Sequence, residues 1–146
     1  VALEIRRPGP TFRAWDNVRF PLREIDVEAA IESLNLRRTE PHEFNSTLRP
    51  IPGRPGVAVS VDSASFRLEH LQPAPGRNVD VLAAQPHSLH AIEGHAELVS
   101  AATGAPIGTL ARGESALVPI GVGAYRVSAA RGAAHIVKVD LPDGDS

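Results

Sequence analysis

Short stretches in which apolar and polar residues alternate fill the chain from residue 57 to residue 141. Side chains of a strand point alternately to its two faces, so this pattern predicts strands with one buried face. Glycines such as Gly94, Gly113 and Gly132 separate the stretches at intervals of roughly 8–12 residues, a spacing typical of all-β sandwiches and barrels. We expect strands at residues 57–61, 66–71, 78–83, 87–92, 96–100, 107–111, 115–119, 124–128 and 135–141.

One segment of the first half, residues 26–34, has helical periodicity. Asp26 is a residue type that caps helix N-termini, and Glu28 lies in the first turn, where its charge complements the helix dipole. The apolar residues that recur at helical spacing are Val27, Ala30, Ile31 and Leu34. We therefore predict one short helix.

The remainder of the first half combines two strand-like segments with a long irregular one. Residues 1–5 are apolar and residues 11–16 alternate, so we expect a pair of strands on either side of the Pro- and Gly-containing turn at 6–10. Residues 37–56 are different, because prolines and glycines interrupt them repeatedly. This segment predicts an irregular connection between two β units.

Composition excludes several classes of protein. The chain has 146 residues, 42% hydrophobic and 22% charged, which suits one globular domain or a domain with a short extension. A formal net charge of −2 gives no electrostatic reason to expect nucleic acid or an anionic membrane as partner. The chain has no cysteine, no apolar run near the roughly 20 residues of a membrane span and no signal-peptide pattern. We therefore expect a cytoplasmic protein.

Two segments of the second half carry a more specific pattern. Residues 90–99 read HAIEGHAELV, and residues 110–121 read LARGESALVPIG. A turn glycine, a Gly-Glu-Ser strand start and a proline near the strand end resemble, in this order, the second half of a cupin barrel. The residues that fit the second cupin motif are Gly113, Pro119 and Gly121. Ala124 and Tyr125 occupy the region where the metal-binding histidine normally follows. The resemblance implies a mainly β, cupin-type jelly-roll barrel without metal, with one short helix and an N-terminal strand extension.

The N-terminal segments narrow the family. Glu4-Ile5 is followed by TFRAWD at residues 11–16 and by REID at residues 23–26, which leads into the expected helix. This order resembles the class I mannose-6-phosphate isomerases, and it is most similar to the shorter bacterial type with its Glu-Ile…Thr-Tyr-Arg-x-Tyr-Asp segment. Phe12 and Trp15 stand in for the aromatic residues of that pattern. Together the two resemblances cover most of the chain.

The resemblance implies interconversion of mannose 6-phosphate and fructose 6-phosphate by a zinc enzyme, with a proton moving between C1 and C2. Arg13 then matches the active-site arginine of the family, whose guanidinium can stabilise an enediolate oxygen or hold the phosphate. A rival register aligns Asp16-Asn17-Val18-Arg19 with the longer enzymes and makes Arg19 that residue. Glu4, Thr11, Trp15 and Asp16 agree with the Arg13 register, but both arginines remain candidates.

The zinc ligands of this family come from a catalytic cupin that would precede Val1. The chain contains no methionine and begins within an apolar run, so we expect an upstream segment in the natural polypeptide. The implied partners are a phosphorylated hexose and this upstream catalytic cupin segment, with no nucleic acid and no membrane. We expect zinc in the full-length enzyme and neither zinc binding nor turnover by this chain alone. Apolar residues at 1–15 would also allow self-association.

Other candidate sites are weaker. His87 and His90 are three residues apart, which places them on opposite faces of a straight strand, and His95 follows a turn. This spacing does not bring together the roughly four ligands of a zinc site. Ser115 lacks the Gly-x-Ser-x-Gly frame of a hydrolase nucleophile.

We expect four segments: 1–24 as terminal strands of the upstream catalytic cupin, 25–56 as helix and Pro-rich connection, 57–141 as a metal-free cupin barrel, and 142–146 as a loose tail. The function implied by the resemblance is that of the C-terminal portion of an aldose–ketose isomerase. A non-enzymatic cupin module that binds a sugar or regulates a partner is the alternative, and an isomerase of altered specificity is a third.

Overall fold

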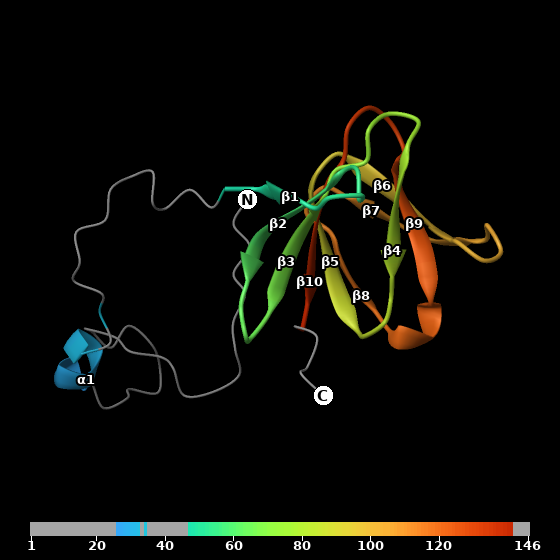
Figure 1. The fold of residues 1–146 in the computed structure, drawn as a ribbon. Helices are drawn as coiled ribbons and strands as arrows, with labels where there is room; N and C mark the ends of the chain where they lie inside the picture. Colours follow the sequence, from blue (N-terminus) through green and yellow to red (C-terminus); the bar gives the residue numbers. More distant parts are fainter. Residues whose placement is uncertain (1–25, 33, 35–46, 142–146) are drawn as a thin grey trace. The chain divides into compact units, whose positions relative to one another are not determined.

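The computed structural model describes residues 26–32, 34 and 47–141, which belong to two units that we describe separately (Figure 1). The first unit contains helix α1 (Val27–Glu32). The backbone N–H of Ala29 donates to Asp26 Oδ1 at 2.9 Å, which confirms the predicted N-cap. The helix ends two residues earlier than the predicted residue 34. The strands predicted at 1–5 and 11–16 lie outside the described residues.

The second unit contains the strands. Their bounds are β1 (Arg49–Pro50), β2 (Val57–Asp62), β3 (Arg67–Leu71), β4 (Asn78–Leu82), β5 (His87–Glu93), β6 (His95–Ser100), β7 (Pro106–Ala111), β8 (Ser115–Val118), β9 (Ala124–Ala129) and β10 (His135–Asp140). A 3-10 helix, η1 (Ile120–Val122), joins β8 to β9. Every strand predicted between residues 57 and 141 is present, and each end lies within one residue of its predicted position.

Strand β1 differs from the predicted irregular connection at 37–56. Arg49 and Pro50 pair with Val59 and Ala58 of β2. Proline has no backbone N–H, but an edge strand tolerates it because only one side of the strand is paired. Since β1 lies at the edge of its sheet, the prolines of this segment did not prevent a short strand.

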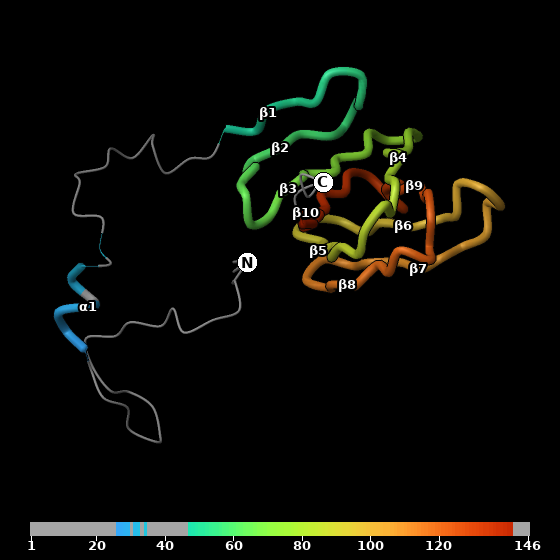
Figure 2. Tube along the Cα trace, turned by 60° about the horizontal axis from the view of Figure 1, so that its bottom comes forward, coloured from blue at the N-terminus to red at the C-terminus, as the bar shows by residue number. Residues whose placement is uncertain are grey.

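Two antiparallel sheets form this unit. The larger has the order β1-β2-β3-β10-β5-β8, and the smaller has the order β4-β9-β6-β7. Figure 2 shows β10 between β3 and β5, although β10 follows them by more than forty residues of sequence. Alternate residues of the strands face inward: in β4, for example, Val79 and Val81 are buried between exposed neighbours. The inward side chains of both sheets make one core, which includes Leu71, Leu89, Leu98, Val127 and Ile136.

The turn between β5 and β6 depends on glycine. Gly94 has a φ of 72°, in the left-handed region that side chains disfavour. A Cβ atom there would lie 2.0 Å from the carbonyl oxygen of Ala133. The chain therefore crosses from the larger sheet to the smaller one at a position that only glycine fits.

Candidate functional site

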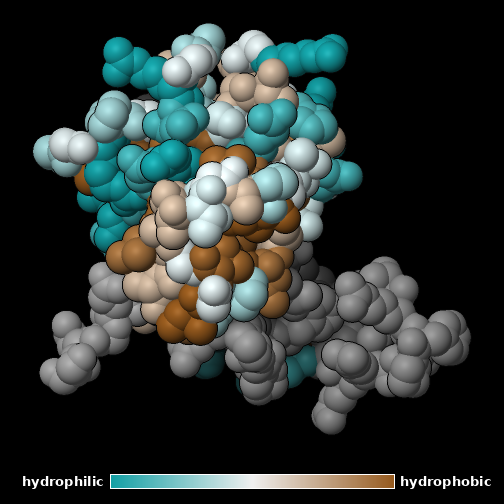
Figure 3. Space-filling view, turned by 90° about the vertical axis from the view of Figure 1, so that its right-hand side faces the viewer, coloured by the Kyte–Doolittle hydropathy of each residue, from teal (hydrophilic) through white to brown (hydrophobic). Residues whose placement is uncertain are grey.

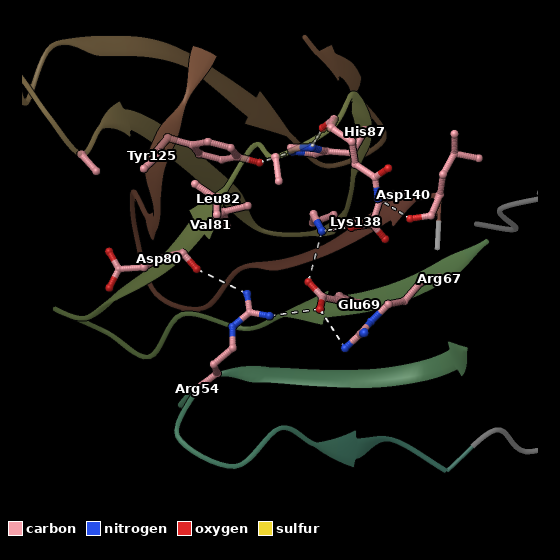
Figure 4. Close-up of a pocket in the computed structure, with 15 residues that line it drawn as sticks. Arg54, Arg67, Glu69, Asp80, Val81, Leu82, His87, Tyr125, Lys138 and Asp140 are labelled. Carbon is pink, nitrogen blue, oxygen red and sulfur yellow. Dashed lines mark hydrogen bonds and ion pairs between the residues drawn. The ribbon is translucent and has the colours of Figure 1, made fainter. Parts of the chain in front are cut away.

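A cavity of about 470 Å³ lies in the barrel, and its wall comes from both sheets (Figure 4). Such a volume is typical of small-molecule sites, which range from roughly 300 to 1,000 Å³. The ionisable residues of the wall are Arg54, Arg67, Glu69, Asp80, His87, Tyr125, Lys138 and Asp140. Its apolar residues include Val81, Leu82 and Leu141.

Strand register brings the charged residues together. In the larger sheet Leu71 pairs with Ile136, Glu69 with Lys138, and Arg67 with Asp140. These residues are two apart along each strand, so all of them point to the inside of the barrel. The inward face of this sheet is therefore apolar at Leu71 and Ile136 and charged at the next two inward pairs.

Glu69 is the centre of the charged group. Its Oε1 accepts from Arg54 Nη1 at 3.1 Å and pairs with Arg67 Nη2 at 3.3 Å, while its Oε2 accepts from Lys138 Nζ at 3.3 Å. The Glu69 side chain is only 4% exposed. Three cations around one carboxylate compensate the desolvation that a buried charge incurs.

Lys138 joins Glu69 to a second carboxylate. Its side chain is 7% exposed, and its ammonium pairs with Asp140 Oδ2 as well as with Glu69. Asp140 Oδ1 and Arg67 Nε are buried and have no hydrogen-bond partner among the described residues. The network thus keeps one acceptor and one donor unused.

A histidine and a tyrosine extend this polar group. His87 Nδ1 lies 3.0 Å from the carbonyl oxygen of Gln85, which can only accept, so Nδ1 carries the proton. His87 Nε2 is then an acceptor, and the Tyr125 hydroxyl donates to it at 2.6 Å. Burial lowers the pKa of His87, and burial together with the nearby carboxylates Asp140 and Glu69 raises the pKa of Tyr125. Both side chains are neutral at neutral pH.

The outer face of the larger sheet holds other histidines. His70 Nδ1 lies 2.7 Å from His135 Nε2, and His70 Nε2 lies 2.8 Å from Ser60 Oγ. His90 Nδ1 lies 2.7 Å from Ser115 Oγ. Burial is the main cause that lowers the pKa of His70, His90 and His135. These histidines are structural hydrogen-bonding groups of the outer face.

The residues singled out in the sequence have different outcomes. The candidate arginines Arg13 and Arg19 lie outside the described residues. His87 and His90 face opposite sides of β5, as predicted: His87 is buried in the cavity wall and His90 lies on the outer face. His95 is exposed. Sequence reasoning missed Glu69 and Lys138, although one signal was present, since Lys138 is the only lysine and stands between two valines.

Among the described residues, no three His, Cys, Asp or Glu side chains are placed so that they could hold a metal ion. Zinc therefore does not fit the described part of the chain. The helices of that part include none of the length and hydrophobicity that crossing a membrane requires.

Three large apolar side chains of the barrel are exposed. Leu82 ends β4, Leu117 lies in β8 and Ile120 begins η1, and all three are more than half exposed. Figure 3 shows the side of the molecule that lies at the right in Figure 1, with apolar residues in its lower part and hydrophilic residues in its upper part. Leu82 and Leu141 also line the cavity, so its wall combines charged groups with apolar surface.

Two antiparallel sheets that share one core and carry a cavity are the architecture of a cupin, that is, a double-stranded β-helix fold, and solved structures agree with this class. An uncharacterised double-stranded β-helix protein from Klebsiella pneumoniae superposes with a TM-score of 0.54 at 18% identity, covering 77% of this chain and 95% of its own. A cupin domain from Bordetella pertussis gives a TM-score of 0.50 at 18% identity over 62% of this chain and 97% of its own. The predicted cupin-type jelly roll is confirmed.

A larger enzyme contains a similar domain. Mannose 6-phosphate isomerase from Salmonella typhimurium, in a structure with its substrate fructose 6-phosphate and zinc, gives a TM-score of 0.62 at 15% identity. The match covers 83% of this chain but 29% of the isomerase, so the chain spans less than a third of that enzyme's length. No protein-family model and no curated protein matches the chain. These likenesses show the fold.

Proposed function

We propose that this chain is the C-terminal portion of a zinc-dependent mannose-6-phosphate isomerase, in which the described barrel is a non-catalytic part. The observation that carries the proposal is the extent of the structural match. The isomerase aligns with 83% of this chain at a TM-score of 0.62, compared with 77% at 0.54 for the Klebsiella pneumoniae protein and 62% at 0.50 for the Bordetella pertussis cupin. The order of the N-terminal segments around Arg13 supports the same family independently of the fold.

The chemistry of the cavity is consistent with a non-catalytic barrel. Moving a proton between two sugar carbons requires a group whose pKa lies near the working pH. Burial lowers the pKa of His87 and raises that of Tyr125, and the Tyr125 hydroxyl donates to His87 Nε2 at 2.6 Å, so each is the other's hydrogen-bond partner. Glu69, Lys138 and Asp140 are held in mutual ion pairs. We therefore assign proton transfer to residues outside the barrel.

Arg13 or Arg19 is the contribution of this chain to the catalytic site in the proposal. A guanidinium stays protonated near neutral pH and can hold a phosphate or stabilise an enediolate oxygen. Zinc, when bound by the upstream cupin, would polarise the sugar oxygens. The phosphorylated hexose and the upstream segment remain the proposed partners.

A coupled isomerase assay on the product of the full natural reading frame tests the proposal. We expect zinc-dependent conversion of mannose 6-phosphate, and a loss of kcat/KM of roughly 100-fold for Arg13→Ala. The exposed Arg77→Ala is the matched control and should keep full activity. If Arg19→Ala loses activity and Arg13→Ala does not, Arg19 is the active-site arginine of the rival register. A folded, zinc-loaded protein without conversion would contradict the proposal and favour a non-enzymatic cupin module.

A further inference from the structure

The charges of the cavity wall are already balanced. Arg54 and Lys138 pair with Glu69, and Arg67 pairs with Glu69 and, at 3.9 Å, with Asp62. The other two carboxylates of the wall are Asp140, which pairs with Lys138, and Asp80, which pairs with Arg126 outside the wall at 3.5 Å, whereas Asp62 does not line the cavity. Each cation thus has a carboxylate within 4 Å, and the cations equal the carboxylates in number. A phosphate or carboxylate ligand would gain a cation only by breaking one of these pairs.

Hydroxyl groups match this wall better than an anion does. A hydroxyl donates one hydrogen bond and accepts others, so it can bridge a guanidinium or ammonium and a carboxylate without disturbing their charge balance. The wall offers both kinds of unused capacity, because Arg67 Nε is an unpartnered donor and Asp140 Oδ1 an unpartnered acceptor. A buried polar group without a partner lowers stability, and a bridging hydroxyl would reduce this cost. Both atoms are shielded from solvent, so a ligand would reach them only after their side chains rotate.

The apolar part of the wall suits the carbon skeleton of such a ligand. Val81, Leu82, Leu141 and the Tyr125 ring line the same cavity as the charged group. A sugar ring presents C–H groups on its faces and hydroxyls at its edge, so it can contact both kinds of surface at once. The volume of about 470 Å³ falls within the range of small-molecule sites.

We infer that the cavity is a binding site for a neutral polyhydroxylated molecule of monosaccharide size. Hydroxyls of the ligand bridge Arg54 or Arg67 to Glu69 and Asp140, and its C–H face lies on Leu82 and Tyr125. The site is built from residues of the barrel and includes neither Arg13 nor Arg19, so it is additional to the proposed isomerase chemistry and does not depend on it.

Titration of the 146-residue chain, followed by calorimetry and by backbone amide NMR shifts, tests the inference. D-mannose and D-glucose are the neutral probes, and mannose 6-phosphate and inorganic phosphate are the charged ones. We expect saturable binding of a neutral sugar at concentrations on the order of 10 mM or below, with shifts at Glu69, Lys138 and Asp140. Mannose 6-phosphate should bind no more tightly than mannose, because the wall has no unpaired cation for the phosphate.

Variants assign the binding to the cavity. Arg54 is 37% exposed, so Arg54→Ala should fold, and we expect it to weaken sugar binding at least about fivefold, the effect of losing one charged hydrogen bond. Arg112→Ala removes the same charge from an exposed position outside the wall and should leave the affinity unchanged. Tyr125→Phe keeps the ring and should weaken binding less than Arg54→Ala does.

Three results would overturn the inference. The first is absence of binding of both neutral sugars at these concentrations. The second is tighter binding of mannose 6-phosphate or phosphate than of mannose, which would make the cavity an anion site. The third is equal affinity of Arg54→Ala and Arg112→Ala, which would place the sugar elsewhere. Loss of isomerase activity in Arg13→Ala bears on the proposed function alone, so the two proposals fail separately.

Discussion

The two ends of the barrel interior are built from the same strands and yet have opposite chemistry. At one end Leu71 pairs with Ile136, and both are fully buried. Two residues along, Glu69 pairs with Lys138, and the next inward pair is Arg67 with Asp140. Removing apolar surface from water stabilises the first end, whereas burial of ions at the second end costs desolvation that their mutual attraction has to offset. A charged interior therefore contributes little to stability, and we attribute it to ligand binding.

The largest effect is expected at the apolar end. Leu71→Ala should lower the free energy of unfolding by about 4 kcal/mol, because it removes a fully buried side chain and leaves a cavity. Urea denaturation measures this loss. Leu117→Ala is the matched control, since Leu117 is 76% exposed, and should change the free energy by less than about 0.5 kcal/mol. Equal losses in the two variants would contradict the burial of Leu71 in the apolar end of the interior.

A smaller effect is expected at the charged end. Lys138→Met should lower the free energy of unfolding by about 2 kcal/mol. This is less than the ~3–5 kcal/mol lost when one partner of a buried ion pair is removed, because Glu69 still pairs with Arg54 and Arg67. Asp140, in contrast, loses its cation. The double variant Lys138→Met/Asp140→Leu removes both partners and should recover most of the stability while it abolishes sugar binding. If the double variant is less stable than Lys138→Met alone, the charged pair is a source of stability.

The smallest effect is a dependence of stability on pH. A histidine in the unfolded chain has a pKa near 6.5, and burial lowers the pKa of His87 in the folded protein. The unfolded state therefore binds more protons than the folded state between the two pKa values, so stability is complete above about pH 6.5 and falls as the pH decreases through this window. Unfolding curves recorded between about pH 7.5 and pH 5 measure the slope. His87→Asn should reduce the slope in part, because burial also lowers the pKa of His70, His90 and His135, whereas Leu71→Ala should lower stability equally at every pH.

Much of the barrel was predictable from the sequence, because the alternation of buried and exposed residues is a local signal. This alternation predicted the ends of each strand in residues 57–141 to within one residue. The helix cap at Asp26, another local signal, was also predicted correctly. The cupin class was predicted because the turn glycines and Pro119 resemble the second cupin motif, and turns between strands fix the positions of these residues.

The cavity was not predictable in the same way. Alternation tells which residues of a strand share a face, but it does not tell which strand lies beside it. Glu69 and Lys138 meet only because β10 lies next to β3, a pairing across 69 residues of sequence. The roles of Arg13 and Arg19 stay predictions, since both lie outside the described residues.

The central place of β10 in the larger sheet has a consequence for biosynthesis. A ribosome releases β3 and β5 long before β10, yet these two strands have no pairing with each other and both pair with β10. Until that strand emerges, the nascent sheet exists as separate pieces with unpaired edges, which are prone to associate with other chains. The larger sheet therefore closes late in translation, and a stop codon before residue 135 would leave β1-β2-β3 and β5-β8 as two separate pieces of it.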